Sequence, residues 1–102
     1  MHICGNITHL LPAIASFKVD ILDLDSAVDL EEAYAMVGPE VIRCGNINPV
    51  LVDERTAAEI LDACKILVDR ERGRKFILSA GCEITVNTKH ENLLAMRKAS
   101  FF

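Results

Sequence analysis

The sequence alternates short apolar runs with amphipathic stretches, and this alternation recurs four times along the chain. The apolar runs lie at residues 1–4, 19–24, 40–44 and 75–79, and most of them are followed by a stretch whose apolar side chains are three to four residues apart. A short apolar run followed by helical periodicity predicts a β-α unit. The runs are apolar on both faces, as is typical of parallel strands covered by helices. The chain is therefore expected to form an α/β fold with a parallel sheet.

Residue types at the ends of the amphipathic stretches predict where the helices begin and end. Helices are expected at about 8–17, 30–37, 56–72 and 89–99. Thr8, Asp29 and Thr88 stand where N-cap residues are expected, because their side-chain oxygens can accept from the first free backbone N–H groups. Gly38-Pro39 and Gly73 are expected to end the second and third helices. The segment 45–55 is expected to be a loop.

Four β-α units can close in two ways, and the pattern alone leaves both open. They can form a small open doubly wound sheet, or half of an eight-unit barrel. In both architectures functional side chains gather at the carboxyl ends of the strands. The candidates at those ends are Cys4, Asp23, Asp25, Cys44, Asn46 and Cys82.

His2 and Cys4 form a candidate chelating pair. Side chains two residues apart on a strand point to the same face, so His2 and Cys4 lie together at the end of the first strand. Cys82 follows the fourth strand at the same end of the sheet. One imidazole and two thiolates suit zinc, and three protein ligands leave the open position of a catalytic site. The alternative is that a short His-x-Cys spacing arises by chance and that the cysteines are ordinary core residues.

Other polar residues have simpler interpretations. Asp23 and Asp25 are placed for a polar contact or a fourth ligand, and a loop-stabilising hydrogen bond is an equal alternative for Asp25. Cys64 lies on the apolar stripe of a helix and is expected in the core, while Cys44 is expected to be a buried, inert thiol or to line the pocket. His9 and His90 are expected at the surface.

Length and composition exclude several classes of protein. A chain of 102 residues is expected to form a single domain, 1–102. The net charge of −4 gives no basic surface for nucleic acid or an anionic membrane. No apolar run is long enough to span a bilayer and the N-terminus lacks the pattern of a signal peptide, so a cytoplasmic location is expected. Four cysteines could form two disulfides, but nothing in the sequence indicates secretion.

Several motifs resemble, in order and spacing, the C-terminal half of the uroporphyrinogen decarboxylase superfamily. They are HICGN at 2–6, DLD at 23–25, VDLEEA at 28–33, GNINP at 45–49, SAGCEI at 79–84 and ENL at 91–93. Within that superfamily the chain most resembles the methylcobalamin:coenzyme M methyltransferases of methanogenic archaea. Their zinc ligands, a His-x-Cys pair and a distant cysteine, match His2, Cys4 and Cys82. True decarboxylases lack these three residues.

The resemblance implies a fold and a reaction. The chain would form β-α units 5 to 8 of a (β/α)8 barrel, the C-terminal half of a TIM barrel. Zinc would bind the thiol of coenzyme M as a thiolate. That thiolate would attack a methyl group on the cobalt of methylcobalamin, carried by a separate corrinoid protein, in a step of methanogenesis. The products would be a methyl thioether and reduced cobalt.

The absence of units 1 to 4 leaves alternatives open. The chain could be an inactive half-barrel fragment that folds or dimerises without turnover, or a metal-free relative resembling the decarboxylases. A twofold homodimer could close an eight-stranded ring, since open strand edges are usually covered. In such a dimer Cys82 of one protomer would approach His2 and Cys4 of its partner.

Overall fold

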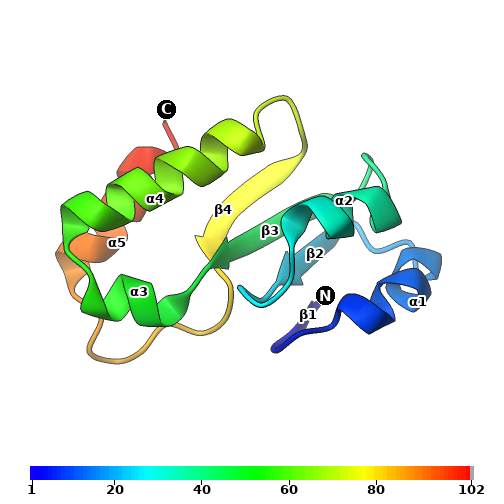
Figure 1. Cartoon of the computed structure of the whole chain (residues 1–102), viewed down its shortest axis with the longest axis horizontal. Coiled ribbons are helices and arrows are strands. Elements are labelled where there is room, and N and C mark those ends of the chain that lie inside the picture. Colours follow the sequence, from blue (N-terminus) through cyan, green and yellow to red (C-terminus); the bar gives the residue numbers. More distant parts are fainter. Residues whose placement is uncertain (102) are drawn as a thin grey trace.

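A computed structural model describes residues 1–101, which form a four-stranded parallel sheet with helices packed against it (Figure 1). The strands are β1 (His2–Ile3), β2 (Ile21–Leu24), β3 (Ile42–Ile47) and β4 (Phe76–Ala80). They lie side by side in the order β1-β2-β3-β4, and every neighbouring pair is parallel. A doubly wound sheet reverses its strand order at a switch point, whereas a barrel keeps the sequential order seen here. The structure therefore selects the half-barrel arrangement over the doubly wound one.

The helices follow the predicted pattern with one addition. They are η1 (Thr8–Leu10), α1 (Leu11–Ser16), α2 (Leu30–Val37), α3 (Pro49–Glu54), α4 (Ala57–Arg70) and α5 (His90–Ala99). The short helix α3 was not predicted and lies in the segment expected to be a loop. None of the helices within residues 1–101 is both long and apolar enough to cross a membrane.

Helix capping agrees with the sequence at α2 and differs at two other helices. The Asp29 carboxylate accepts from the backbone N–H groups of Glu31 and Glu32 and so begins α2 as predicted. The predicted N-caps Thr8 and Thr88 are wrong. The residues that precede η1 and α5 are Ile7 and Lys89, and neither helix has a side-chain cap.

The two faces of the sheet differ in exposure. Leu22 and Leu24 on β2 are fully buried against the helices, whereas Ile21 on β2 and Ile77 on β4 are 41% and 43% exposed on the other face. Right-handed crossovers between sequential parallel strands place all the helices on one face. The shortest dimension, 17 Å, has room for the sheet and one layer of helices. The face that would line the interior of a closed barrel is therefore uncovered.

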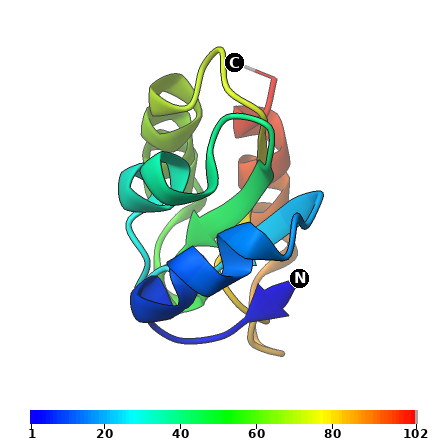
Figure 2. The same ribbon diagram turned by 90° about the vertical axis from the view of Figure 1, so that its right-hand side faces the viewer.

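The core consists of two hydrophobic clusters, one at each end of the molecule. The first lies between β2 and the adjacent helices α1 and α2, which pack side by side in both views (Figures 1 and 2). The second lies under α4 and α5 and includes Cys64. The prediction that Cys64 belongs to the core is confirmed, and burial raises the pKa of its thiol to about 11.

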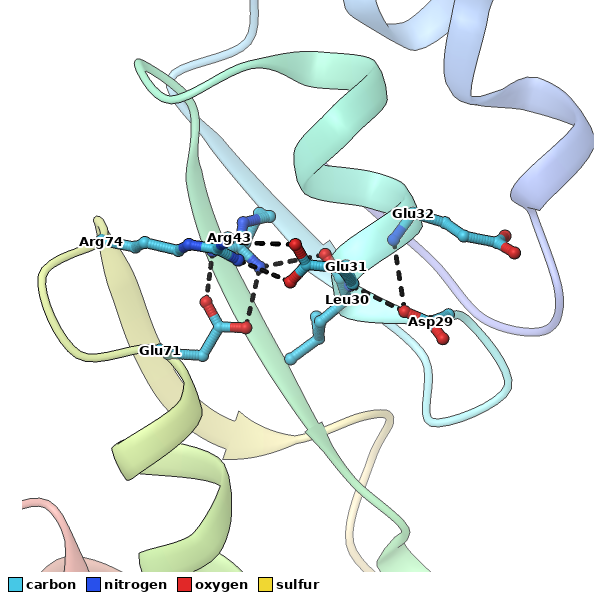
Figure 3. Close-up of polar contacts among 7 residues, drawn as sticks. All are labelled: Asp29, Leu30, Glu31, Glu32, Arg43, Glu71 and Arg74. Atoms are coloured by element: carbon cyan, nitrogen blue, oxygen red, sulfur yellow. Dashed lines mark hydrogen bonds and ion pairs between the residues drawn. The ribbon is translucent and has the colours of Figure 1, made fainter.

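A buried ion pair joins the two ends of the molecule across β3 (Figure 3). Arg43 on β3 is fully buried, and its guanidinium binds both carboxylate oxygens of Glu71, the residue that follows α4. The same guanidinium donates to the carbonyl oxygen of Leu30 in α2, 3.1 Å away, and lies 4.8 Å from the ring centre of Tyr34. Arg43 therefore ties α2 and the end of α4 to the middle of the sheet.

Candidate metal centre

The three predicted metal ligands converge in one place. One ligand atom each from His2, Cys4 and Cys82 lies within 4.8 Å of the other two. His2 belongs to β1 and Cys4 follows it, while Cys82 comes two residues after β4 at the opposite edge of the sheet. All three ligands come from a single chain. The expectation that Cys82 of one protomer would meet His2 and Cys4 of a partner is therefore not what the structure shows.

Two glycines allow the loops above the sheet to approach one another. A Cβ atom at Gly81 would overlap the backbone of Asp25 and Ser26, so the turn that carries Cys82 can pass over the end of β2 only with glycine at position 81. A Cβ at Gly45 would lie 2.7 Å from the carbonyl oxygen of Leu24, and φ at Gly45 is +141°, a region that side chains disfavour. Close approach of the backbone therefore explains why glycine stands at position 45 of the GNINP motif and at position 81 of the SAGCEI motif.

Asp25 holds the turn that follows Cys4. Its carboxylate accepts from the backbone N–H of Gly5 at 3.0 Å and from the N–H of Ala27 at 2.9 Å. These two backbone hydrogen bonds, from Ala27 and then Gly5, lower the pKa of the Asp25 carboxyl below its ordinary value of 3.8. Of the two interpretations offered by the sequence, Asp25 fits the loop-stabilising one.

Asp23 contacts the predicted ligand His2. The Nδ1 atom of His2 lies 3.0 Å from the Asp23 carboxylate and 3.2 Å from the Asp23 carbonyl oxygen. The other ring nitrogen, Nε2, lies 3.0 Å from the sulfur of Cys4. The second carboxylate oxygen of Asp23 is shielded from solvent, and the carboxylate also accepts a hydrogen bond from the thiol of Cys44 on β3. The sequence predicted a polar contact at Asp23 but not that its partner would be a ligand.

The remaining candidates, Cys44 and Asn46, lie outside the group of three converging side chains. Cys44 is a free, half-buried thiol whose pKa is raised by burial and by the neighbouring negative charge of Asp23. The side-chain amide of Asn46 donates to the carbonyl oxygens of Asp25 and Val28, at 3.2 and 2.7 Å. Asn46 therefore shapes the loop after β2, and His9 and His90 lie at the surface as predicted.

A cavity of about 520 Å³ opens away from these ligands. It lies between α2 and α4, and its charged lining residues are Asp29, Glu31, Arg70 and Glu71. None of the three predicted metal ligands lines it. The predicted ligands therefore lie outside this cavity, which Asn46 of the strand-end candidates does line.

The sulfurs of Cys4 and Cys82 are joined as a disulfide in the structure. Zinc binds thiolates, so the same two sulfurs can serve either the disulfide or a metal, and a metal requires the reduced pair. In reduced form the donor set of one imidazole nitrogen and two sulfurs fits zinc in softness and charge. Among residues 1–101, the ring nitrogen that faces Cys4 has no other hydrogen-bond partner, whereas Nδ1 is already engaged by Asp23. The residues present thus fit a zinc ion.

Comparison with known proteins places this chain in a family. The family model described as uroporphyrinogen decarboxylase (URO-D) matches residues 1–100. The chain belongs to this family. The uroporphyrinogen decarboxylase of Methylobacillus flagellatus is 35% identical over 89 residues, which are 87% of this chain and 25% of that protein. The corresponding enzyme of Prochlorococcus marinus strain MIT 9211 is 39% identical over 77 residues, 72% of this chain and 21% of the relative.

A solved structure extends the likeness to the fold. A methyltransferase from Methanosarcina mazei superposes with a TM-score of 0.84 at 24% identity, over 98% of this chain and 29% of that one. The expected superfamily is confirmed, and so is the α/β fold equivalent to the C-terminal half of a (β/α)8 barrel. The chain spans about a quarter of the length of the curated decarboxylases that it matches.

Proposed function

We propose that this member of the uroporphyrinogen decarboxylase family carries the zinc site of a methyltransferase. The reaction would move a methyl group from a methylated corrinoid to the thiol of coenzyme M. The observation that carries the proposal is the convergence of His2, Cys4 and Cys82 within 4.8 Å at the carboxyl ends of the strands. Barrel enzymes of this class place their active sites at that end.

The three side chains would hold the metal and leave room for the substrate. In the reduced protein Cys4 and Cys82 would hold zinc as thiolates after releasing their protons, and His2 would hold it through a neutral ring nitrogen. Bound zinc supplies Lewis acidity, which lowers the pKa of a thiol in its open coordination position toward neutrality. His2 and Cys4 are exposed, so a thiol and a methyl donor can approach from solvent.

The proposed methyl transfer needs no reactant besides coenzyme M and the methylated corrinoid. The thiol of coenzyme M would lose its proton to solvent, and its sulfur would attack the methyl carbon, so that a carbon–sulfur bond forms as the cobalt–carbon bond breaks. The electron pair of the broken bond remains on cobalt. The products are a methyl thioether and cobalt reduced by two electrons. A methyl donor on a separate corrinoid protein would suit a site at the molecular surface.

A decarboxylase-like activity is the second candidate. It is favoured by the curated relatives, which are uroporphyrinogen decarboxylases with up to 39% identity to this chain. This alternative gives no role to the three converging metal ligands. A third possibility is that the chain binds zinc but needs further barrel units for turnover.

Metal content and activity separate these three possibilities. The protein would be reduced with a phosphine, loaded with zinc, desalted and analysed for metal. We expect one zinc per chain in the wild type and in Cys64→Ala, a control at a buried cysteine outside the site, and none in Cys82→Ser. Absence of zinc from the reduced wild type would refute the methyltransferase proposal.

Methyl transfer would then be measured with methylcobalamin and coenzyme M, through the absorbance change of the corrinoid. Zinc-dependent turnover that is lost in Cys82→Ser supports the methyltransferase. Stoichiometric zinc without turnover would instead identify this chain as a metal-binding half-barrel. Decarboxylation of uroporphyrinogen by metal-free protein would favour the second candidate.

A further inference from the structure

We propose that Asp23 is the positioning residue of the metal centre, holding the His2 ring so that Nε2, and not Nδ1, is presented to the metal. The expected effect of Asp23 on metal binding rests on the proposed function. The orientation of the His2 ring is independent of that function, because it follows from contacts within this chain.

The two ring nitrogens of His2 have different surroundings. Nδ1 is close to two groups that can only accept, the ionised carboxylate of Asp23 at 3.0 Å and the Asp23 carbonyl oxygen at 3.2 Å. Nδ1 must therefore carry the proton of a neutral imidazole. Nε2 then has the lone pair, and it lies 3.0 Å from the Cys4 sulfur, among the predicted ligand atoms. The ring is thus already in the tautomer that a metal at Nε2 requires.

The sheet register fixes this arrangement. Asp23 on β2 is the register partner of His2 on β1, so both side chains emerge on the same face of neighbouring strands. The backbone N–H of Asp23 donates to the carbonyl oxygen of Met1 at 2.9 Å, and this bond holds the strands together beside the pair. Asp23 is thus placed by the fold, not by a flexible loop.

The Asp23 carboxylate contacts side chains on both neighbouring strands. One of its oxygens engages His2 on β1, and the carboxylate also accepts a hydrogen bond from the thiol of Cys44, its register partner on β3. A carboxylate behind a metal-bound imidazole has a specific use, because it fixes the ring and makes it a stronger donor.

Three variants test the assignment. Asp23→Ala removes the carboxylate, and Asp23→Asn keeps a weaker, uncharged acceptor of similar size. Asp20→Asn is the matched control, because Asp20 is exposed at the other end of the same sheet region, just before β2. Zinc affinity of the reduced proteins would be measured by competition with a chromophoric chelator. The tautomer of His2 would be measured in metal-free protein by ring ¹⁵N chemical shifts, at a pH at which the imidazole is neutral.

We expect Asp23→Ala to bind zinc about 10- to 100-fold more weakly than the wild type, the usual cost of losing such a partner. Asp23→Asn should recover part of that loss, and Asp20→Asn should match the wild type. In the metal-free wild type the His2 shifts should report a proton on Nδ1. In Asp23→Ala they should move toward the Nε2-protonated form, limited by the carbonyl oxygen that remains. Metal-free thermal unfolding would show whether each variant is folded.

The outcomes distinguish the positioning role of Asp23 from the proposed zinc-dependent function on which it builds. Wild-type zinc affinity in a folded Asp23→Ala protein, with an unchanged His2 tautomer, would overturn the role of Asp23 and leave the zinc site intact. A reduced wild type that binds no zinc would overturn the metal function, and the ¹⁵N shifts would still decide how the ring is held. A wild-type proton on Nε2 would overturn the positioning assignment in either case.

Discussion

Replacing Arg43 with methionine would break the buried ion pair between β3 and the end of α4. Arg43 is fully buried and Glu71 is 5% exposed, so loss of the guanidinium leaves a carboxylate in the core with no opposite charge. The Leu30 carbonyl oxygen loses its Arg43 donor at the same time. Methionine keeps most of the apolar volume, which limits the effect of an empty space.

The expected loss follows from the desolvation of Glu71. Removing one partner of a buried pair typically costs about 3–5 kcal/mol, because the other charge stays buried. A domain of this size is stable by only about 5–15 kcal/mol, so Arg43→Met should lose a large share of its stability. Replacing both partners, as in Arg43→Met with Glu71→Leu, removes the uncompensated charge and should recover most of the loss.

A second arginine pair offers the control. Arg74 binds the Glu31 carboxylate at 2.6 and 3.1 Å (Figure 3). Its guanidinium lies 3.9 Å from the ring centre of Tyr34, the same ring that Arg43 approaches. The Glu31 side chain is 70% exposed and solvent screens this pair, so Arg74→Met should lose much less stability than Arg43→Met. Urea unfolding followed by far-UV circular dichroism would give the free energy of unfolding of the wild type, the two single arginine variants and the double variant. Equal losses for the two single arginine variants, or no recovery in the double variant, would refute the reasoning.

Three further predictions concern the site and its surroundings. Since the folded pKa of Asp25 lies below 3.8, its ionised carboxylate stabilises the fold above that pH. The difference in free energy of unfolding between wild type and Asp25→Ala should therefore be constant near neutrality and shrink as the pH falls below 3.8. Urea unfolding at several pH values would measure this difference, and a difference that does not change with pH would contradict the prediction. Alkylation of reduced protein at pH 8, followed by mass spectrometry, should modify exposed Cys4 long before Cys64. A Cys64 pKa of about 11, against an ordinary 9.0, leaves about a hundredfold less thiolate, and equal rates would contradict this burial. The uncovered sheet face predicts that the 102-residue chain forms the expected homodimer; sedimentation of a folded monomer at micromolar concentration would count against it.

The fold was predictable because each unit carries local signals that agree with one another. Apolar runs mark all four strands, and the Asp29 cap and the Gly38 stop bound α2 as expected. The errors occur where local signals compete. Thr8 has the chemistry of an N-cap, but its N–H and hydroxyl are both engaged by the Asn6 side chain. Helix α3 is only six residues long, too short for hydrophobic periodicity to reveal it, although its Asn48 cap and Pro49 are start signals in hindsight.

The convergence of the three candidate ligands was predictable, whereas the geometry around them was not. The rule that parallel strands end at one edge of a sheet selects Cys4 and Cys82, which are 78 residues apart, as neighbours. No local pattern shows that Gly81 must lack a side chain for the two loops to meet, because the obstacle is backbone from another unit. The contact between Asp23 and His2 depends on the register of β1 against β2, which periodicity does not determine. The buried Arg43 was missed because an arginine within a strand ordinarily suggests an exposed position.

Metal binding and barrel closure are separate problems for this chain. All three proposed ligands and the Asp23 partner of His2 come from one chain, so a zinc ion could be held without any neighbouring subunit. The uncovered face is an independent feature, since its exposed Ile21 and Ile77 lie along the strands and are not among the ligands. A protein that covers this face would not need to supply a metal ligand. Zinc content should therefore follow the redox state of Cys4 and Cys82, whereas turnover should depend on what closes the barrel.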